Sequence, residues 1–200
     1  EQPTPDQFFA TIKELERSDP QGLVIDLRDN GGGLLSSAVD MLARFVEFKT
    51  VVTMKGRGER VETVRTPGGL LHAFKYPIVI LVNERSASAA EIFSGVMRDY
   101  KLATLVGEHT YGKASVQNVI PLPDRTSAKI TIAHYGLPSG TAIARKVDDD
   151  GTYISGGIKP DVEVKLSTDP NVALGNLKTD NQLQKAVEII LQKNPKAHKN

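Results

Sequence analysis

The sequence predicts an α/β domain, because two apolar strands are each followed by a turn and an amphipathic helix. The first strand is the continuous apolar run from Leu23 to Arg28, and the second and more strongly apolar run extends from Tyr76 to Asn83. Such runs are typical of strands buried on both faces of a parallel sheet. Apolar residues at helical spacing then predict helices over 34–48 and 88–100.

Length and composition indicate one globular domain. The chain has 200 residues, of which 40% are hydrophobic and 24% charged, which is ordinary for a domain with its own core. The net charge of +1 gives no electrostatic reason to expect nucleic acid or an anionic membrane as a partner. The absence of cysteine excludes a thiol nucleophile, a disulfide framework and thiolate metal sites. We expect neither a metal nor a cofactor.

The remaining segments extend the α/β pattern. Alternation from Lys129 to Ala133 predicts a strand with one solvent-facing side, and Asp180 is expected to cap a final helix. The acidic triplet Asp148 to Asp150 lacks the ligand spacing of a calcium loop and is expected to be an exposed turn. Further elements are expected over 4–15 (helix), 51–54 and 61–64 (two strands), and 103–107, 115–120 and 162–164 (strands).

Ser88 is a candidate nucleophile, because it lies where the strand ending at Asn83 turns into a helix. A serine hydroxyl attacks poorly until a neighbouring base takes its proton, and unusual triads use lysine for this task. Lys113, 25 residues later in a glycine turn, is the candidate base. Its amine pKa must fall from ~10.4 to about 7–8, which burial achieves. We therefore expect the Lys113 side chain to be desolvated.

Backbone amides are candidates for stabilising the negative charge that develops on a reacting carbonyl. The first N–H groups of a helix are unpaired, so the amide of Ala89 is one expected oxyanion donor. The turn Gly31-Gly32-Gly33 could supply a second donor, because it also follows a buried strand. If residues 113–117 are extended, Gln117 points to the same side as Lys113, and its amide could orient the amine.

Each of these features also has an ordinary structural interpretation. Ser88 and Glu91 match a capping box, which merely satisfies the start of a helix. By default Lys113 is a solvated lysine, and the glycine turn only leads into a helix. Asp99 lies ~16 Å from Ser88 along the helix axis at ~1.5 Å per residue, so its expected role is structural. A histidine base is an alternative without a distinctive partner pattern; the candidates are His72, His109 and His134.

Four motifs, taken in chain order, resemble a known family. They are LVIDLRDNGGGLL, NERSASAAEIF, VGEHTYGKASVQ and GGIKPDVEV. Together they resemble the carboxy-terminal processing peptidases, also called tail-specific proteases, over about residues 6–192. The resemblance implies an α/β fold with a crotonase-like core of stacked ββα units. It also implies a serine endopeptidase that cleaves proteins near their C-termini through an acyl-enzyme.

Matched motif by motif, the resemblance also implies the roles of individual residues. These are Ser88 (nucleophile), Lys113 (base), Gln117 (helper) and Ala89, Gly32 or Gly33 (oxyanion donors). The departures from the family pattern are Arg85 where glycine is common, Ala90 where serine is common, Gly31 where proline is common and Ala114 where glycine is common. None of these departures removes a reacting group, although Arg85 could alter access to the site.

The resemblance further implies what surrounds this core. Family members usually carry a helical segment and a peptide-binding PDZ domain before it, so residues 1–200 are expected to be a single catalytic core truncated at the N-terminus. The implied partners are the C-terminal segments of substrate proteins, and the implied location is the periplasm or cell envelope, or the thylakoid lumen of a photosynthetic organism. Two rival hypotheses are an inactive peptide- or ligand-binding domain on the same fold, and an enzyme core that is inactive without its PDZ domain.

Overall fold

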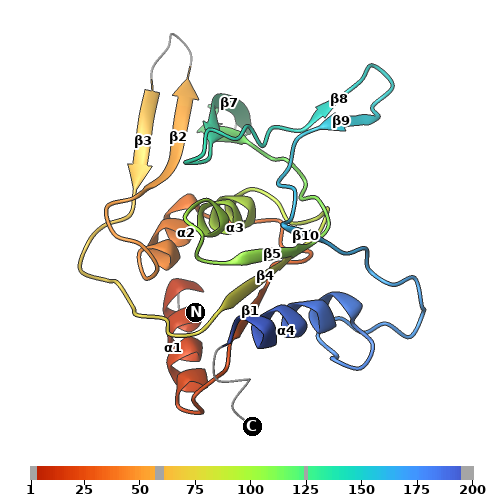
Figure 1. Ribbon diagram of the computed structural model, residues 1–200. Coiled ribbons are helices and arrows are strands. Elements are labelled where there is room, and N and C mark those ends of the chain that lie inside the picture. The colour runs from red at the N-terminus through yellow and green to blue at the C-terminus, as the bar shows by residue number, and fades with distance from the viewer. Residues whose placement is uncertain (1–3, 57–60, 124–125, 195–200) are drawn as a thin grey trace.

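The chain folds into layers in which helices separate two sheets. A computed structural model describes all residues except 1–3, 57–60, 124–125 and 195–200. Helices α2 (Leu35–Leu42) and α3 (Ala89–Asp99) lie between a parallel and an antiparallel sheet, and α4 (Asn181–Lys193) covers the other face of the parallel sheet (Figure 1). The predicted α/β class, with its parallel sheet, is confirmed.

The parallel sheet has the strand order β1-β4-β5-β10. Its strands are β1 (Leu23–Asp26), β4 (Ile78–Val82), β5 (Thr104–Gly107) and β10 (Val162–Glu163). All three neighbouring pairs are parallel, so the carboxyl ends of β1 and β4 meet at one edge of the sheet. The turns that follow these two strands are therefore neighbours in space.

Strand β4 is buried on both faces, which explains its continuous apolar sequence. Ile80 belongs to the core that includes α2 and α3, whereas Leu81 packs in a second cluster with Ile190 of α4. Both β4 side chains are 0% exposed. Because successive strand residues point to opposite faces, a strand between two helical layers has no position for a polar side chain.

The antiparallel sheet has the order β3-β2-β7-β6. Its strands are β2 (Thr50–Gly56), β3 (Val61–Arg65), β6 (Ser115–Pro121) and β7 (Ser127–Gly136). The expected pair over 51–64 is an antiparallel hairpin, and the connection at 57–60 lies outside the described residues. The expectation of one buried side over 129–133 was wrong at its two isoleucines. Ile130 and Ile132 are 47% and 50% exposed, whereas burial on this strand begins farther along, at Tyr135 with 6% exposure.

Two further differences concern element boundaries. Helix α2 ends at Leu42 rather than near residue 48. Farther along, Phe48 adopts a φ of 54° and its N–H donates to the Thr66 carbonyl at 3.1 Å, where the chain turns toward β2. The expected acidic turn joins two strands that were not predicted, β8 (Lys146–Val147) and β9 (Tyr153–Ser155). Their exposed side chains leave no buried alternation to detect. Helix α1 (Thr4–Glu16) begins as expected.

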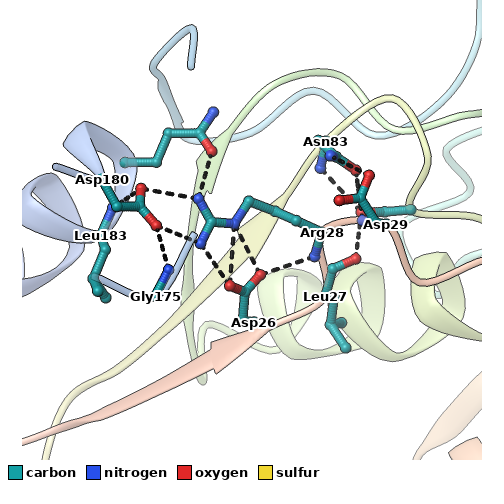
Figure 2. Close-up of polar contacts among 10 residues, drawn as sticks. Asp26, Leu27, Arg28, Asp29, Asn83, Gly175, Asp180 and Leu183 are labelled. Atoms are coloured by element: carbon teal, nitrogen blue, oxygen red, sulfur yellow. Dashed lines mark hydrogen bonds and ion pairs between the residues drawn. The ribbon is translucent and has the colours of Figure 1, made fainter. Parts of the chain in front are cut away.

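Helix α4 is attached to β1 by a buried ion pair (Figure 2). The guanidinium of Arg28 donates two hydrogen bonds to the Asp180 carboxylate, at 3.0 and 2.7 Å, and also contacts Asp26 at 2.6 Å. Asp180 is the N-cap of α4, as predicted, and accepts from the Leu183 N–H at 3.0 Å. The start of the last helix is thereby fixed to the end of the first strand.

Candidate active site

The turns after β1 and β4 are joined by hydrogen bonds. The Asn83 side chain accepts from the Asp29 N–H at 3.0 Å and donates to the Asp29 carboxylate at 3.1 Å (Figure 2). Farther along the same two turns, the Ala87 N–H donates to the Asn30 carbonyl at 2.9 Å. The Asn30-to-Gly33 turn is therefore held directly against the segment that leads into Ser88.

Gly32 makes the closest approach between these turns. A Cβ atom at this position would lie 2.5 Å from the Ala87 carbonyl oxygen and 2.8 Å from the Ala89 nitrogen. Gly32 also has a φ of +95°, which side-chain-bearing residues rarely adopt. Its own N–H donates to the Asn30 side chain at 2.9 Å. Only glycine allows the first turn to reach the peptide that follows Ser88.

Ser88 occupies a strained backbone conformation at the start of α3. It is the N-cap residue, with φ 57° and ψ −119°. For a residue other than glycine this conformation costs about 1–3 kcal/mol, and such strain gathers at functional sites. A sharp strand-to-helix turn of this kind presents the hydroxyl of a serine nucleophile away from the strand. The half-buried Ser88 side chain accordingly lines a cavity of about 300 Å³.

Glu91 connects the Ser88 turn to the Lys113 turn. Its side chain is fully buried, at 0% exposure, and accepts hydrogen bonds from the backbone N–H groups of Ser88 (2.9 Å), Gly112 (2.7 Å) and Lys113 (2.8 Å) and from the Thr110 hydroxyl (2.5 Å). Four donors and the N-terminal end of α3 replace the hydration that the carboxylate loses. One carboxylate thus fixes the backbone of both candidate catalytic residues.

This role of Glu91 was missed from the sequence, where the glutamate was interpreted only as half of a capping box. That half is present, since Glu91 accepts from the Ser88 N–H. The signal that could have revealed more is the glycine turn 21 residues later, with backbone donors at Gly112 and Lys113. A buried carboxylate requires several donors, and one helix start supplies too few of them.

Lys113 lies at the same cavity as Ser88, but its side chain is exposed. The expected burial of this amine is therefore not found. The reason is the alternation along the segment: the neighbouring Ala114 points into the core with 4% exposure, so Lys113 points outward. Within the described part of the chain, no hydrogen bond joins Ser88 Oγ to Lys113 Nζ.

Gln117 and Gly33 line this cavity too. The Gln117 amide donates to the Thr131 hydroxyl at 3.4 Å rather than to Lys113. A register shift between Val116 and Gln117 interrupts the regular alternation that was assumed for this segment. The amide of Ala89 is the first of α3, so it has no acceptor within the helix.

Asp99 and His72 do not line this cavity. Asp99 is at the opposite end of α3, where it accepts from the Ser139 N–H at 2.9 Å, a contact that supports its expected structural role. His72 pairs with Glu16 at 2.9 Å in a separate region. Among the described residues, no cluster of three or more potential ligands could hold a metal ion, and no helix has the length and apolarity to cross a membrane.

A strained serine at a helix start and a lysine turn fixed by the same carboxylate together form the candidate active site. Comparison with known proteins gives the family. Residues 1–164 match the description "Peptidase family S41", and the chain belongs to that family.

Similar proteins in this family carry processing-protease names. The chain is 31% identical to a carboxyl-terminal-processing protease of Picosynechococcus sp., over 93% of this chain and 42% of that protein. It is 37% identical to a carboxy-terminal-processing protease of Bartonella bacilliformis, over 67% of this chain and 32% of the relative. The solved structure of a photosystem II D1 C-terminal processing protease matches with a TM-score of 0.67 at 30% identity, over 84% of this chain and 40% of that one. The chain therefore spans less than half the length of these relatives.

Proposed function

We propose that this chain is the catalytic core of a serine endopeptidase that cleaves proteins near their C-termini. Ser88 is the nucleophile, Lys113 the general base and Gln117 the group that orients the lysine amine once substrate is bound. The observation that carries this proposal is the buried Glu91 carboxylate, which binds the backbones of Ser88 and Lys113 at 2.9 and 2.8 Å. A simple helix cap gives no reason for the second contact.

The proposed reaction passes through an acyl-enzyme. Neutral Lys113 takes the Ser88 hydroxyl proton as Oγ attacks the scissile carbonyl carbon. Collapse of the tetrahedral intermediate breaks the C–N bond, and the Lys113 ammonium protonates the departing amine. Lys113 then deprotonates a water molecule that attacks the Ser88 ester. As the C–O bond to Ser88 breaks and the acid product leaves, the Lys113 ammonium returns the proton to Ser88 Oγ. A bound peptide covers the exposed Lys113 amine and excludes water from the dyad.

The proposed oxyanion donors are the amides of Ala89 and Gly33. The Gly32 amide is committed to the Asn30 side chain at 2.9 Å, which favours Gly33 as the second donor. Gly33 and Ala89 also border a neighbouring cavity of about 380 Å³, which reaches Phe93. We propose that this cavity receives the substrate side chain next to the scissile bond.

Lys113→Ala is the direct test of the dyad. We expect the rate at which a fluorophosphonate probe labels Ser88 to fall by ~100-fold or more, because a general base contributes ~10²–10⁴-fold. Peptide cleavage should fall in parallel, with unchanged circular dichroism. Lys165→Ala removes another exposed lysine and serves as the matched control. Equal labelling of the Lys113→Ala variant and the wild type would exclude the assignment.

A latent core is the second candidate function. The exposed Lys113 side chain and its missing hydrogen bond to Ser88 favour a chain that binds peptide but cleaves only after the dyad is completed. Labelling of Ser88 with and without a saturating C-terminal peptide distinguishes the two. If bound substrate completes the dyad, the peptide must either be cleaved or accelerate the labelling of Ser88. A latent core binds the peptide without either effect.

Two broader features complete the proposal. The parallel sheet, the α2 and α3 layer and the antiparallel sheet support a crotonase-like arrangement.

The substrates we propose are C-terminal segments of proteins, which the names of the similar proteases support. The proposed location, by analogy with the family, is the periplasm or cell envelope, or the thylakoid lumen in a photosynthetic organism. Fractionation of the source cells tests this location.

A further inference from the structure

Tyr135 contacts the carbonyl groups of Ser88 and Lys113, two of the three residues whose amides bind Glu91. Its hydroxyl lies within hydrogen-bonding distance of the Lys113 carbonyl and, at 3.3 Å, of the Ser88 carbonyl. The Tyr135 N–H also donates to the Ala114 carbonyl at 2.9 Å. The residue is only 6% exposed, and its ring belongs to the main core. Its position is therefore set by packing, independently of the groups that it contacts.

We propose that Tyr135 is a positioning residue, which holds the Lys113 turn at the distance from Ser88 that proton transfer requires. This inference rests on the proposed dyad. Glu91 accepts from the N–H side of both residues and Tyr135 donates on the carbonyl side, so each backbone segment is held from two directions. Without the Tyr135 hydroxyl, the Lys113 carbonyl loses this contact, and a shift of the backbone at Lys113 carries the amine away from the serine.

The chemistry of the tyrosine suits this role. The hydroxyl supplies one proton for two carbonyl acceptors, and the Lys113 carbonyl is the nearer of the two. Burial and the neighbouring Glu91 carboxylate raise the pKa of Tyr135 above its ordinary value, so the hydroxyl keeps this proton at neutral and moderately alkaline pH. Phenylalanine would fill the same space without the donor.

The rest of the Lys113 turn is anchored on its other side. The Arg145 N–H donates to the Gly112 carbonyl at 2.8 Å, and the Arg145 guanidinium lies 5.3 Å from the ring centres of both Tyr111 and Tyr153. These contacts precede Lys113 in the chain. Tyr135 is the described side chain that holds the turn at the lysine carbonyl itself, and so it controls where the amine begins.

Tyr135→Phe tests the proposal in the full chain with a fluorophosphonate probe. We expect the maximal labelling rate of Ser88 to fall ~10–100-fold, because displacement of a catalytic group by ~1 Å can cost ~10²-fold. The probe concentration for half-maximal rate should change less than about twofold, since the cavity keeps its shape. Tyr100→Phe is the matched control, because the Tyr100 hydroxyl also donates to a backbone carbonyl, that of Thr50 at 2.9 Å. Its labelling rate should stay within about twofold of the wild type.

A role through Lys113 also predicts that the two substitutions are not additive. In a Lys113→Ala background, adding Tyr135→Phe should leave the residual labelling rate unchanged, whereas a general loss of structure would lower it further. If Tyr135→Phe does not fold, 4-aminophenylalanine at position 135 keeps a donor and should label within a few-fold of the wild type. A folded aminophenylalanine variant that labels as slowly as Lys113→Ala overturns the proposal.

The proposed Ser88–Lys113 dyad and the positioning role of Tyr135 are contradicted by different results. If Ser88 is not the labelled residue, or if Lys113→Ala labels normally, the proposed function fails and the role of Tyr135 fails with it. If the dyad passes both tests but Tyr135→Phe matches the wild type in maximal rate, the positioning role alone is wrong.

Discussion

Replacing Asp180 with asparagine removes one charge from a pair that is almost completely buried. The side chains of Arg28 and Asp180 are 1% and 0% exposed. Asparagine is also a good N-cap, so it can still accept from the Leu183 N–H that Asp180 binds at 3.0 Å. The substitution therefore keeps the cap but removes the charge, and it places an N–H₂ group where the second carboxylate oxygen accepts from Arg28 at 2.7 Å and from the Gly175 N–H at 2.9 Å. Arg28 keeps its contact with Asp26 at 2.6 Å, which limits but does not remove the cost of an unbalanced guanidinium.

The magnitude follows from the pKa of Asp180. Burial alone would raise this pKa, but the hydrogen bonds from Arg28, Leu183 and Gly175 and the charge of Arg28 together outweigh burial and lower it from 3.8 to about 2. At ~1.36 kcal/mol per pKa unit, ionisation of Asp180 contributes about 2.5 kcal/mol to the free energy of unfolding at neutral pH. Breaking a buried pair typically costs ~3–5 kcal/mol. Because Asp26 remains, we expect Asp180→Asn to lower the free energy of unfolding by about 2–3 kcal/mol.

The direction of the pKa shift predicts how the stability difference between wild type and Asp180→Asn changes with pH. The pKa of Asp180 is lower in the folded than in the unfolded protein, so ionised Asp180 stabilises the fold above pH 3.8. This stabilisation is lost as the pH falls from 3.8 toward 2. Urea unfolding should therefore show the full difference between wild type and variant at neutral pH and about half of it at pH ~3. Glu188→Gln, at an exposed pair with Lys185, is the control and should leave the unfolding midpoint unchanged. A wild-type-like midpoint for Asp180→Asn, or a difference that does not shrink in acid, would refute the reasoning.

Two further substitutions test how the site is held together. Gly32→Ala should lower the labelling rate of Ser88 by ~100-fold, since its Cβ would meet the Ala87 carbonyl at 2.5 Å and displace the turn; Gly31→Ala, with no atom within 4 Å of the added Cβ, should remain within about twofold. Glu91→Gln should lower the free energy of unfolding by ~2–3 kcal/mol, measured in urea, because one buried amide N–H₂ would then face backbone donors. The same variant should label Ser88 at least ~10-fold more slowly, and normal labelling would show that the carboxylate is only a helix cap.

The parallel sheet and the meeting of its two turns could be predicted from local sequence. Strands β1 and β4 are continuous apolar runs because helices cover both faces, and each run is followed by a recognisable turn. Parallel pairing then brings Gly32 and Ser88 to one edge. These features could be predicted because a short, continuously apolar segment is stable only as a strand buried on both faces.

The contacts that join separate segments could not be predicted in this way. Glu91 has the local signature of a capping residue, and its contact with the Lys113 N–H depends on a turn 22 residues away. Similarly, the isoleucines of β7 alternate like those of a half-buried strand, but Ile132 is 50% exposed, because alternation does not reveal whether another layer covers the apolar side. Lys113 is exposed because its neighbour Ala114 is buried, and the composition of this segment does not predict which of the two residues faces the core.

The Arg28–Asp180 pair also determines when folding can be completed during synthesis. The two residues are 152 positions apart, so at ~5–20 residues per second the ribosome needs about 8–30 s to make the partner after Arg28 has been added. During that interval Arg28, which follows β1, has the Asp26 carboxylate but not that of Asp180 as a partner, and the α4 face of the sheet is uncovered. The first strand of this chain therefore acquires its final environment only when the last helix has emerged.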